Sequence, residues 1–124
     1  MKKIRVVVVD DNFVSRRLPS YILRPFGMNI QVLECASGDE ALCLIDTHQI
    51  THLLLDISMP GMDGIKVAKK IRSSSKYLEI RLIAYTADAL AKDVVHLKSV
   101  GFDDVLLKPL NRERLLEALG ILTP

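Results

Sequence analysis

The sequence predicts a single α/β domain in which a five-stranded parallel sheet is covered by helices on both faces. Five short runs of β-branched and leucine residues alternate with segments of helical periodicity. The runs are apolar almost throughout, which is typical of strands buried on both faces. Because 124 residues match one ordinary domain, we expect residues 1–124 to form one unit with right-handed crossovers between strands.

The first strand and helix should cover residues 4–27. Residues 4–9 are apolar except for Arg5 and are followed by two acids, and Asn12 is placed to cap the following helix. Pro19 removes one helical hydrogen bond and should bend this helix, which ends near Gly27. The apolar stripe expected to face the sheet consists of Phe13, Val14, Leu18, Ile22 and Phe26.

The second strand should run over residues 30–36. Ser37, with Glu40 three residues later, matches a capping box that opens a helix ending near Thr47. A third strand, residues 53–55, ends in Asp56 and is followed by a loop rich in proline and glycine. The later elements expected are helices over 65–74, 89–100 and 110–119 and strands over 80–85 and 105–107.

Composition and charge exclude several classes of protein. Apolar residues make up 49% and charged residues 26%, the balance of a globular rather than a disordered chain. The 17 basic and 15 acidic residues are spread along the sequence, so we expect no direct nucleic-acid binding. The apolar run near the N-terminus is too short for a signal peptide or a membrane span. We therefore expect a cytoplasmic protein without a membrane anchor.

The two cysteines and three histidines carry no recognisable motif. Cys35 and Cys43 form no C-x-x-C pair and have no clustered histidine partners, so neither a zinc site nor a redox motif is indicated. We expect both thiols to be free and buried, and the scattered histidines to have no chemical role.

Polar side chains occur where four of the predicted strands end: Asp10, Asp11, Asp56, Thr86 and Lys108. In an open α/β sheet the ligand site lies outside the carboxyl ends of the strands. Because clustered carboxylates repel one another unless a cation neutralises them, and hard oxygen ligands suit Mg²⁺ or Mn²⁺, we expect a metal site at this edge.

The same groups have the chemistry of phosphoryl transfer. A carboxylate can act as a nucleophile and form an aspartyl phosphate if cations offset the charge on the phosphoryl oxygens. Lys108 could supply a second cation beside the metal. The Thr86 hydroxyl and the backbone N–H of Ala87 could complete a cradle for the same oxygens.

Four motifs together resemble the receiver domain of response regulators in two-component signalling. They are Val-Val-Asp-Asp-Asn at 8–12, Leu-Asp-Ile-Ser-Met-Pro-Gly-Met-Asp-Gly at 55–64, Tyr-Thr-Ala at 85–87 and Lys-Pro at 108–109. The resemblance covers nearly the whole chain. It implies a flavodoxin-like, doubly wound sheet with strand order 2-1-3-4-5 and five helices.

The resemblance also implies roles for particular residues. Asp56 would be the phosphoacceptor and Thr86 the switch hydroxyl, while Lys108 would hold the phosphate and precede a cis peptide bond to proline. The implied Mg²⁺ ligands are Asp11, Asp56 and the backbone carbonyl of Ser58, with Asp10 assisting through water. The chain would catalyse its own phosphorylation and dephosphorylation.

The resemblance further implies partners. Phosphate would come from a sensor histidine kinase or a histidine phosphotransfer protein, and the surface of the fourth and fifth helices would meet a downstream protein or a second copy. Val105 stands where receivers often carry an aromatic switch residue. A phosphorylation-independent interaction module therefore remains an alternative. A hydrolase or nucleotide-binding protein is a third hypothesis, although the sequence has no P-loop, no G-x-G-x-x-G and no Asp-x-Asp at the acceptor.

Overall fold

The computed structural model describes residues 3–57, 63–87 and 91–121. Within them, five parallel strands form one sheet in the order β2-β1-β3-β4-β5, which confirms the expected doubly wound topology. Ser58, the rest of the loop up to residue 62 and the expected start of the fourth helix at 89–90 lie outside the described residues. The strands are β1 (Ile4–Val9), β2 (Ile30–Cys35), β3 (His52–Asp56), β4 (Arg81–Thr86) and β5 (Asp104–Leu107).

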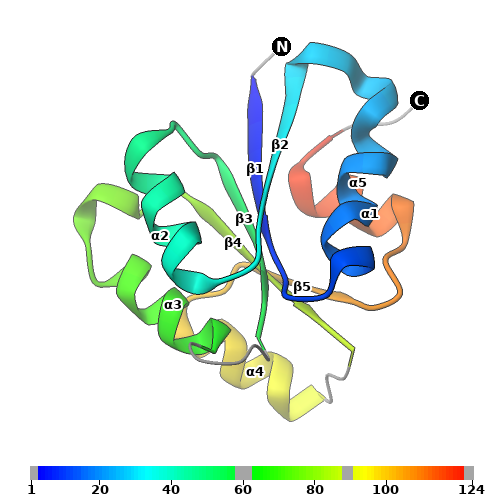
Figure 1. Ribbon diagram of the computed structural model, residues 1–124. Helices are drawn as coiled ribbons and strands as arrows, with labels where there is room; N and C mark the ends of the chain where they lie inside the picture. Colours follow the sequence, from blue (N-terminus) through cyan, green and yellow to red (C-terminus); the bar gives the residue numbers. More distant parts are fainter. Residues whose placement is uncertain (1–2, 58–62, 88–90, 122–124) are drawn as a thin grey trace.

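Helices cover both faces of the sheet (Figure 1). On one side lie α1 (Phe13–Leu23) and α5 (Arg112–Leu119). On the other side lie α2 (Gly38–Thr47), α3 (Gly64–Arg72) and α4 (Ala91–Val100). Short 3-10 turns, Arg24–Asn29 and Ser75–Tyr77, follow α1 and α3.

The sheet divides the core into two halves because successive strand residues point to opposite faces. Val7 and Val9 pack toward α2, α3 and α4, whereas Val6 and Val8 pack toward α1 and α5. All four valines are fully buried. Each such side chain contributes about 2 kcal/mol of burial free energy, which explains why four consecutive valines form this interior strand.

Polar side chains begin four of the helices. Asn12, Ser37, Asp63 and Asn111 each accept a hydrogen bond from the backbone N–H three residues later. The caps predicted at Asn12 and Ser37 are confirmed. Such a cap is worth about 1 kcal/mol. Two of them, Asn12 and Asp63, begin helices that start beside the carboxyl ends of β1 and β3.

The predicted apolar stripe of α1 was right for Ile22 and Phe26, which pack against the core, and wrong at its start. Phe13 and Val14 are exposed, and the buried residues of the helix are Pro19 and Leu23. The helix runs on through Pro19, whose apolar ring belongs to the buried face. Phe13 is covered instead by guanidinium groups, with Arg17 Cζ 5.2 Å from its ring centroid.

An arginine joins the end of α3 to the turn after α4. Arg72 Nε donates to Gly101 O at 3.0 Å, and Arg72 Nη2 pairs with Asp103 Oδ2 at 2.8 Å. A Cβ atom on Gly101 would lie 2.6 Å from Arg72 Cγ, and the backbone φ of +126° also favours glycine. Gly101 ends α4, as predicted, and the Arg72 side chain fixes that end in place.

The cysteines differ from each other. Cys35 is buried, and burial raises the pKa of its thiol to about 12, which keeps it protonated and unreactive. Cys43 is exposed on α2, so the prediction that it is buried was wrong; the apolar face of α2 is formed by other residues. None of the described helices has the length and apolar character needed to cross a membrane.

Candidate functional site

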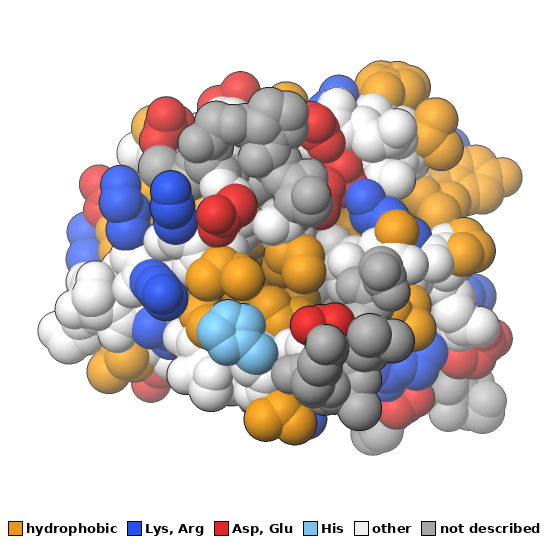
Figure 2. Space-filling model, turned by 90° about the horizontal axis from the view of Figure 1, so that it is seen from below, with side chains coloured by type: hydrophobic (Ala, Val, Ile, Leu, Met, Phe, Trp, Pro, Cys, Tyr) orange, Lys and Arg blue, Asp and Glu red, His pale blue; other side chains and the backbone are white. Residues whose placement is uncertain are grey.

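The carboxyl ends of four strands bring the predicted polar residues to one edge of the sheet. Asp10 and Asp11 follow β1, Asp56 ends β3, Thr86 ends β4 and Lys108 follows β5. Figure 2 shows this edge, where acidic side chains lie beside the segments that the structure does not describe. The parallel register places β1 next to β3 and β3 next to β4, so residues distant in sequence become neighbours.

Three carboxylates gather there. Asp10, Asp11 and Asp56 each offer one oxygen, and these oxygens all lie within 4.8 Å of one another. Asp10 and Asp56 are buried, whereas Asp11 is exposed. The cluster is therefore open to solvent on the Asp11 side and closed by the sheet on the other.

Lys108 approaches two of these acids. Its Nζ lies 2.8 Å from Asp10 Oδ2 and 3.6 Å from Asp56 Oδ2, and its side chain is 20% exposed. The following peptide bond, to Pro109, is cis, as the resemblance implied. Lys108 N also donates to Thr86 O at 2.8 Å, which joins the end of β5 to the end of β4.

The backbone and one carboxylate oxygen of Asp10 are held firmly. Its Oδ1 accepts from Asn12 N at 2.9 Å, and its carbonyl oxygen accepts from Arg16 Nη1 at 2.9 Å. The other oxygen, Oδ2, accepts no hydrogen bond from the residues that the structure describes. Its contact with Lys108 is therefore held by charge rather than by an aligned hydrogen bond. A buried oxygen of this kind retains capacity for a further ligand.

The donor set fits a hard divalent cation. Among the residues that the structure describes, these three carboxylates share one ammonium, so in their ionised forms the cluster carries a net negative charge. Mg²⁺ prefers oxygen ligands and typically keeps several waters beside one or two carboxylates, which suits an open cluster with one exposed member. Asp11 and Asp56 would hold such an ion, with Asp10 beside them. The predicted ligand at Ser58 lies outside the described residues.

Thr86 and Ala87 occupy the expected place at the end of β4. Thr86 is buried, and its carbonyl oxygen is bonded to Lys108 N. Ala87, the next residue, is exposed. Thr86 thus links the acid cluster to β5 through the sheet itself.

Gly64 is needed for close packing rather than for an unusual backbone angle. Its φ is not positive. A Cβ atom there would lie 2.7 Å from Ile57 Cα and would also strike the backbone of Asp56. The first turn of α3 therefore packs directly on the peptide that carries the acceptor candidate.

Sequence reasoning missed two residues of the site. Arg16 reaches back one turn to the Asp10 carbonyl, and the ring of Tyr85 lies under Lys108, with Nζ 4.8 Å from the ring centroid. Burial, followed by the negative charges of Asp10 and Asp56, raises the pKa of Tyr85 to about 12. No spacing rule finds either contact, although an aromatic residue directly before Thr86 was visible.

Val105, at the position where receivers often carry an aromatic switch residue, packs against the core. It is half-buried against the core on the α2, α3 and α4 side. A groove of about 500 Å³ lies over β5 between α4 and α5. Its lining includes Val94, Lys98, Val105, Leu107, Leu110 and Arg114.

The chain is similar in sequence to known signalling proteins. Residues 6–120 match the response regulator receiver domain. Chemotaxis protein CheY1 of Helicobacter pylori is 32% identical over 118 residues, which cover 94% of each chain. The CAI-1 autoinducer sensor kinase/phosphatase CqsS of Vibrio cholerae is 33% identical over 94% of this chain, which spans 17% of that protein. Stress response regulator protein 1 of Debaryomyces hansenii is 30% identical over 85% of this chain and 43% of its own length.

Solved structures agree in fold. Chemotaxis protein CheY4 of Vibrio cholerae superposes with a TM-score of 0.86 at 30% identity, over 95% of this chain and 97% of its own. The receiver domain of sensor histidine kinase PA1611 from Pseudomonas aeruginosa, solved with a magnesium ion in its active site cleft, gives 0.81 at 28% identity over 94% of each chain. The Saccharomyces cerevisiae receiver domain of Ssk1, in complex with the histidine phosphotransfer protein Ypd1, gives 0.84 at 25% identity over 95% and 87%.

Proposed function

Because this chain belongs to the response regulator receiver domain family, a family of signalling switches, we propose that Asp56 is its phosphoacceptor. The donor is a phosphohistidine on a sensor kinase or a phosphotransfer protein. In this reaction an Asp56 carboxylate oxygen attacks phosphorus and forms the new P–O bond. The P–N bond breaks, and its electron pair returns to the imidazole of the donor.

The neighbouring residues stabilise the charge that develops on the phosphoryl oxygens. The Lys108 ammonium, 3.6 Å from Asp56 Oδ2, supplies a movable positive charge. The Thr86 hydroxyl and the Ala87 N–H donate to the remaining oxygens. Asp11, Asp56 and the backbone carbonyl of Ser58 would hold Mg²⁺, with Asp10 assisting through water, and the ion would offset negative charge on the phosphoryl group. The same groups assist the attack of water that later removes the phosphate.

One observation carries this proposal: three carboxylates lie together beside one ammonium at the carboxyl edge of the sheet. A purely structural cluster would balance its charges, because buried unpaired charge destabilises the fold. A net negative charge on the described groups, beside an open surface, instead favours a cation and, with it, an incoming phosphoryl group. This site therefore favours the phosphoacceptor hypothesis over the phosphorylation-independent interaction module.

The groove over β5, between α4 and α5, is the surface that we assign to a downstream protein or a second copy. Leu107 on β5 lines this groove and exposes a large apolar side chain. Phosphorylation acts through Thr86, whose carbonyl is bonded to the backbone at the end of β5. The signal then biases a pre-existing two-state equilibrium of this surface. Because Val105 stands in place of an aromatic residue, β5 itself, rather than the rotation of an aromatic ring, transmits the effect of phosphorylation to the groove.

Replacement of the acceptor tests the function. With phosphoramidate and Mg²⁺, the parent protein should gain an acid-labile phosphoryl adduct by intact mass, and Asp56→Asn should gain none, because an amide cannot form the acyl phosphate. Asp46→Asn, far from the site, is the matched control and should behave as the parent. Phosphate incorporation that survives in Asp56→Asn would contradict the assignment of the acceptor.

The interaction-module alternative makes a different prediction. Titration with Mg²⁺ and beryllofluoride should change the backbone amide chemical shifts of Thr86 and of residues around the groove over β5. If neither responds, the chain does not sense phosphorylation and the alternative is correct.

A further inference from the structure

The Lys108 ammonium is enclosed on a third side by an aromatic ring. Asp10 Oδ2 lies 2.8 Å away and Asp56 Oδ2 3.6 Å away, while the ring centroid of Tyr85 lies 4.8 Å away. A cation within about 6 Å of a ring centroid is attracted by the negative face of the ring, most strongly where water is excluded. Lys108 is only 20% exposed, so this attraction is weakly screened.

The ring itself has little freedom to move. Tyr85 lies on β4 between β3 and β5, paired with Asp56 on one side and Leu106 on the other, and is 1% exposed. Its hydroxyl donates to the carbonyl oxygen of Ser15 on α1 at 3.5 Å. A tyrosine phenol is neutral at pH 7. The ammonium therefore faces a fixed, uncharged π surface.

A neutral ring suits a cation that must change partners. When a phosphoryl group arrives on Asp56, Lys108 has to turn from carboxylate oxygens to phosphoryl oxygens. Another carboxylate in the place of Tyr85 would compete for the ammonium with a strong, directional ion pair. A ring attracts the positive charge but has no lone pair aimed at it, so it limits where the ammonium lies without holding it back.

We propose that Tyr85 is a positioning residue for phosphoryl transfer, whose ring keeps the Lys108 ammonium beside Asp56 and free to contact the incoming phosphoryl oxygens. This inference rests on the proposed function. In this role Tyr85 acts through Lys108.

Fluorinated rings separate this role from simple packing. Tyr85 is replaced by phenylalanine, 4-fluoro-, 3,5-difluoro- and 3,4,5-trifluorophenylalanine, which nearly keep ring size while each fluorine weakens the negative face. The initial rate of phosphorylation by phosphoramidate with Mg²⁺ should fall in that order, by about threefold to tenfold from the first ring to the last. A flat or unordered series would overturn the proposal.

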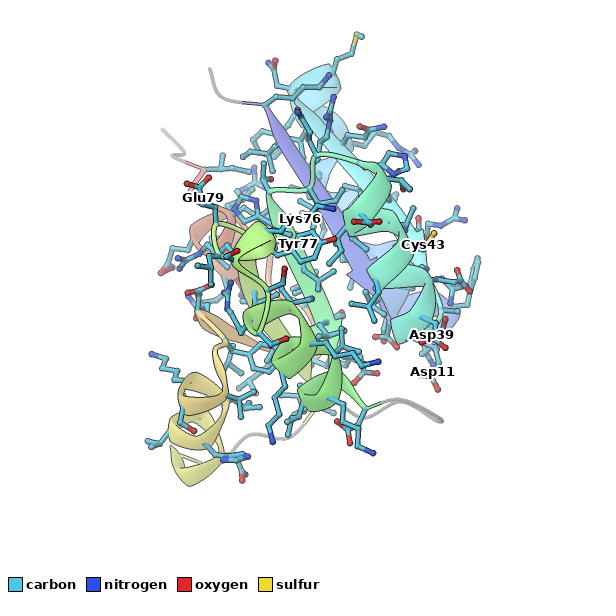
Figure 3. The ribbon with its side chains drawn as sticks, turned by 90° about the vertical axis from the view of Figure 1, so that its left-hand side faces the viewer. Asp11, Asp39, Cys43, Lys76, Tyr77 and Glu79 are labelled. Atoms are coloured by element: carbon cyan, nitrogen blue, oxygen red, sulfur yellow. The ribbon has the colours of Figure 1, made fainter. Side chains whose placement is uncertain are left out.

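The chain contains a matched control for the chemistry of fluorination. Lys76 Nζ lies 5.4 Å from the ring centroid of Tyr77 at the opposite end of the sheet. Figure 3 shows Lys76 and Tyr77 well separated from Asp11 at the acceptor edge. The same fluorinated series at Tyr77 should leave the phosphorylation rate unchanged. An equal fall in both series would overturn the proposal.

A second measurement does not depend on phosphorylation. Urea unfolding midpoints are compared across the Tyr85 series in the parent and in Lys108→Met, which keeps the side-chain length without the charge. The midpoint should decrease with fluorination more steeply in the parent, because only there does the ring face a cation. Equal slopes would overturn the ring–ammonium contact. If the parent takes up no phosphate while the slopes differ, the proposed function fails and the contact stands.

Discussion

The two ends of the sheet carry the same three residue types in different surroundings. At the carboxyl edge, Lys108 pairs with Asp10 and lies over Tyr85. At the opposite edge, Lys76 pairs with Asp46 and lies over the adjacent Tyr77 ring. The side chains of Lys108 and Asp10 are 20% and 0% exposed, against 64% and 55% for Lys76 and Asp46.

The difference lies in how each carboxylate is satisfied. Asp46 accepts hydrogen bonds from both Lys76 and the Tyr77 hydroxyl. Its charge is therefore neutralised by Lys76 within an exposed cluster. Asp10 has a buried oxygen without an aligned donor among the described residues. Asp56 shares its partner Lys108, and an Asp11 oxygen lies within 4.8 Å of the other two carboxylates. Residue types alone therefore do not mark a functional site. A buried cluster with a net charge is a better indicator of such a site.

Removing the two lysines should separate the two ends most clearly. Lys108→Met should slow phosphorylation by phosphoramidate by about 100-fold, because one preorganised charge on the transferring group is lost. Lys76→Met should leave the rate unchanged, since its ammonium only closes a solvated ion pair. Initial rates at saturating Mg²⁺ measure both. Similar rates in the two variants would remove the distinction between the clusters.

Two glycine substitutions should separate the ends by geometry. Gly64→Ala forces a Cβ against the backbone of Asp56 and Ile57, so we expect a loss of about 1–3 kcal/mol in unfolding free energy together with slower phosphorylation. Gly120→Ala, at φ +74° with open space around it, should cost about 1 kcal/mol of stability and leave phosphorylation intact. Urea unfolding and phosphoramidate kinetics on both variants test this, and a normal rate in Gly64→Ala would contradict it.

The far edge should make its own contribution to the pH dependence of stability. Burial and, secondarily, the positive charge of Arg81 lower the pKa of His52 to about 4. Between about pH 6.5 and 4, His52 is protonated in the unfolded chain but stays neutral in the folded chain. Stability should therefore fall over this range by an amount of the order of 1 kcal/mol, and His52→Gln should lack that part of the fall. Unfolding midpoints measured from pH 7 to 4 check this, and identical profiles would contradict it.

The smallest effect should come from the exposed cluster. Hydrogen bonds from Lys76 and the Tyr77 hydroxyl lower the pKa of Asp46. Its contribution is present above the unfolded pKa and is lost as pH falls through the lower folded value. Asp46→Asn should remove this acid-range decrease, and added salt should shrink it in the parent. A large stability loss at neutral pH would show that solvent screens this cluster less than its exposure indicates.

The strands were predictable because their signal is local. An apolar run such as residues 4–9 must be buried on both faces, and β1 has those bounds. The acids and the lysine at the strand ends then followed from topology. The buried face of α1 was only partly predictable, because Pro19 was expected to bend the helix, whereas its ring forms part of the buried surface.

The contacts of the site depend on distant parts of the chain. Tyr85 meets Lys108 only because β4 and β5 are neighbours and the peptide after β5 turns the lysine back toward β1. Arg16 reaches Asp10 only because α1 starts at Asn12. Sequence periodicity reports which face a residue takes, but the partner on that face is a property of the assembled sheet.

The Arg72 side chain gives α4 the mechanics of a hinged lever. Its bonds to Gly101 and Asp103 anchor the Val100 end of the helix to α3, which makes that end a fulcrum. A displacement of α4 that begins beside Thr86 is then greatest at the Ala91 end and fades toward Val100. We therefore expect any movement of α4 to change the groove over β5 more toward its Ala91 end than toward its Val100 end.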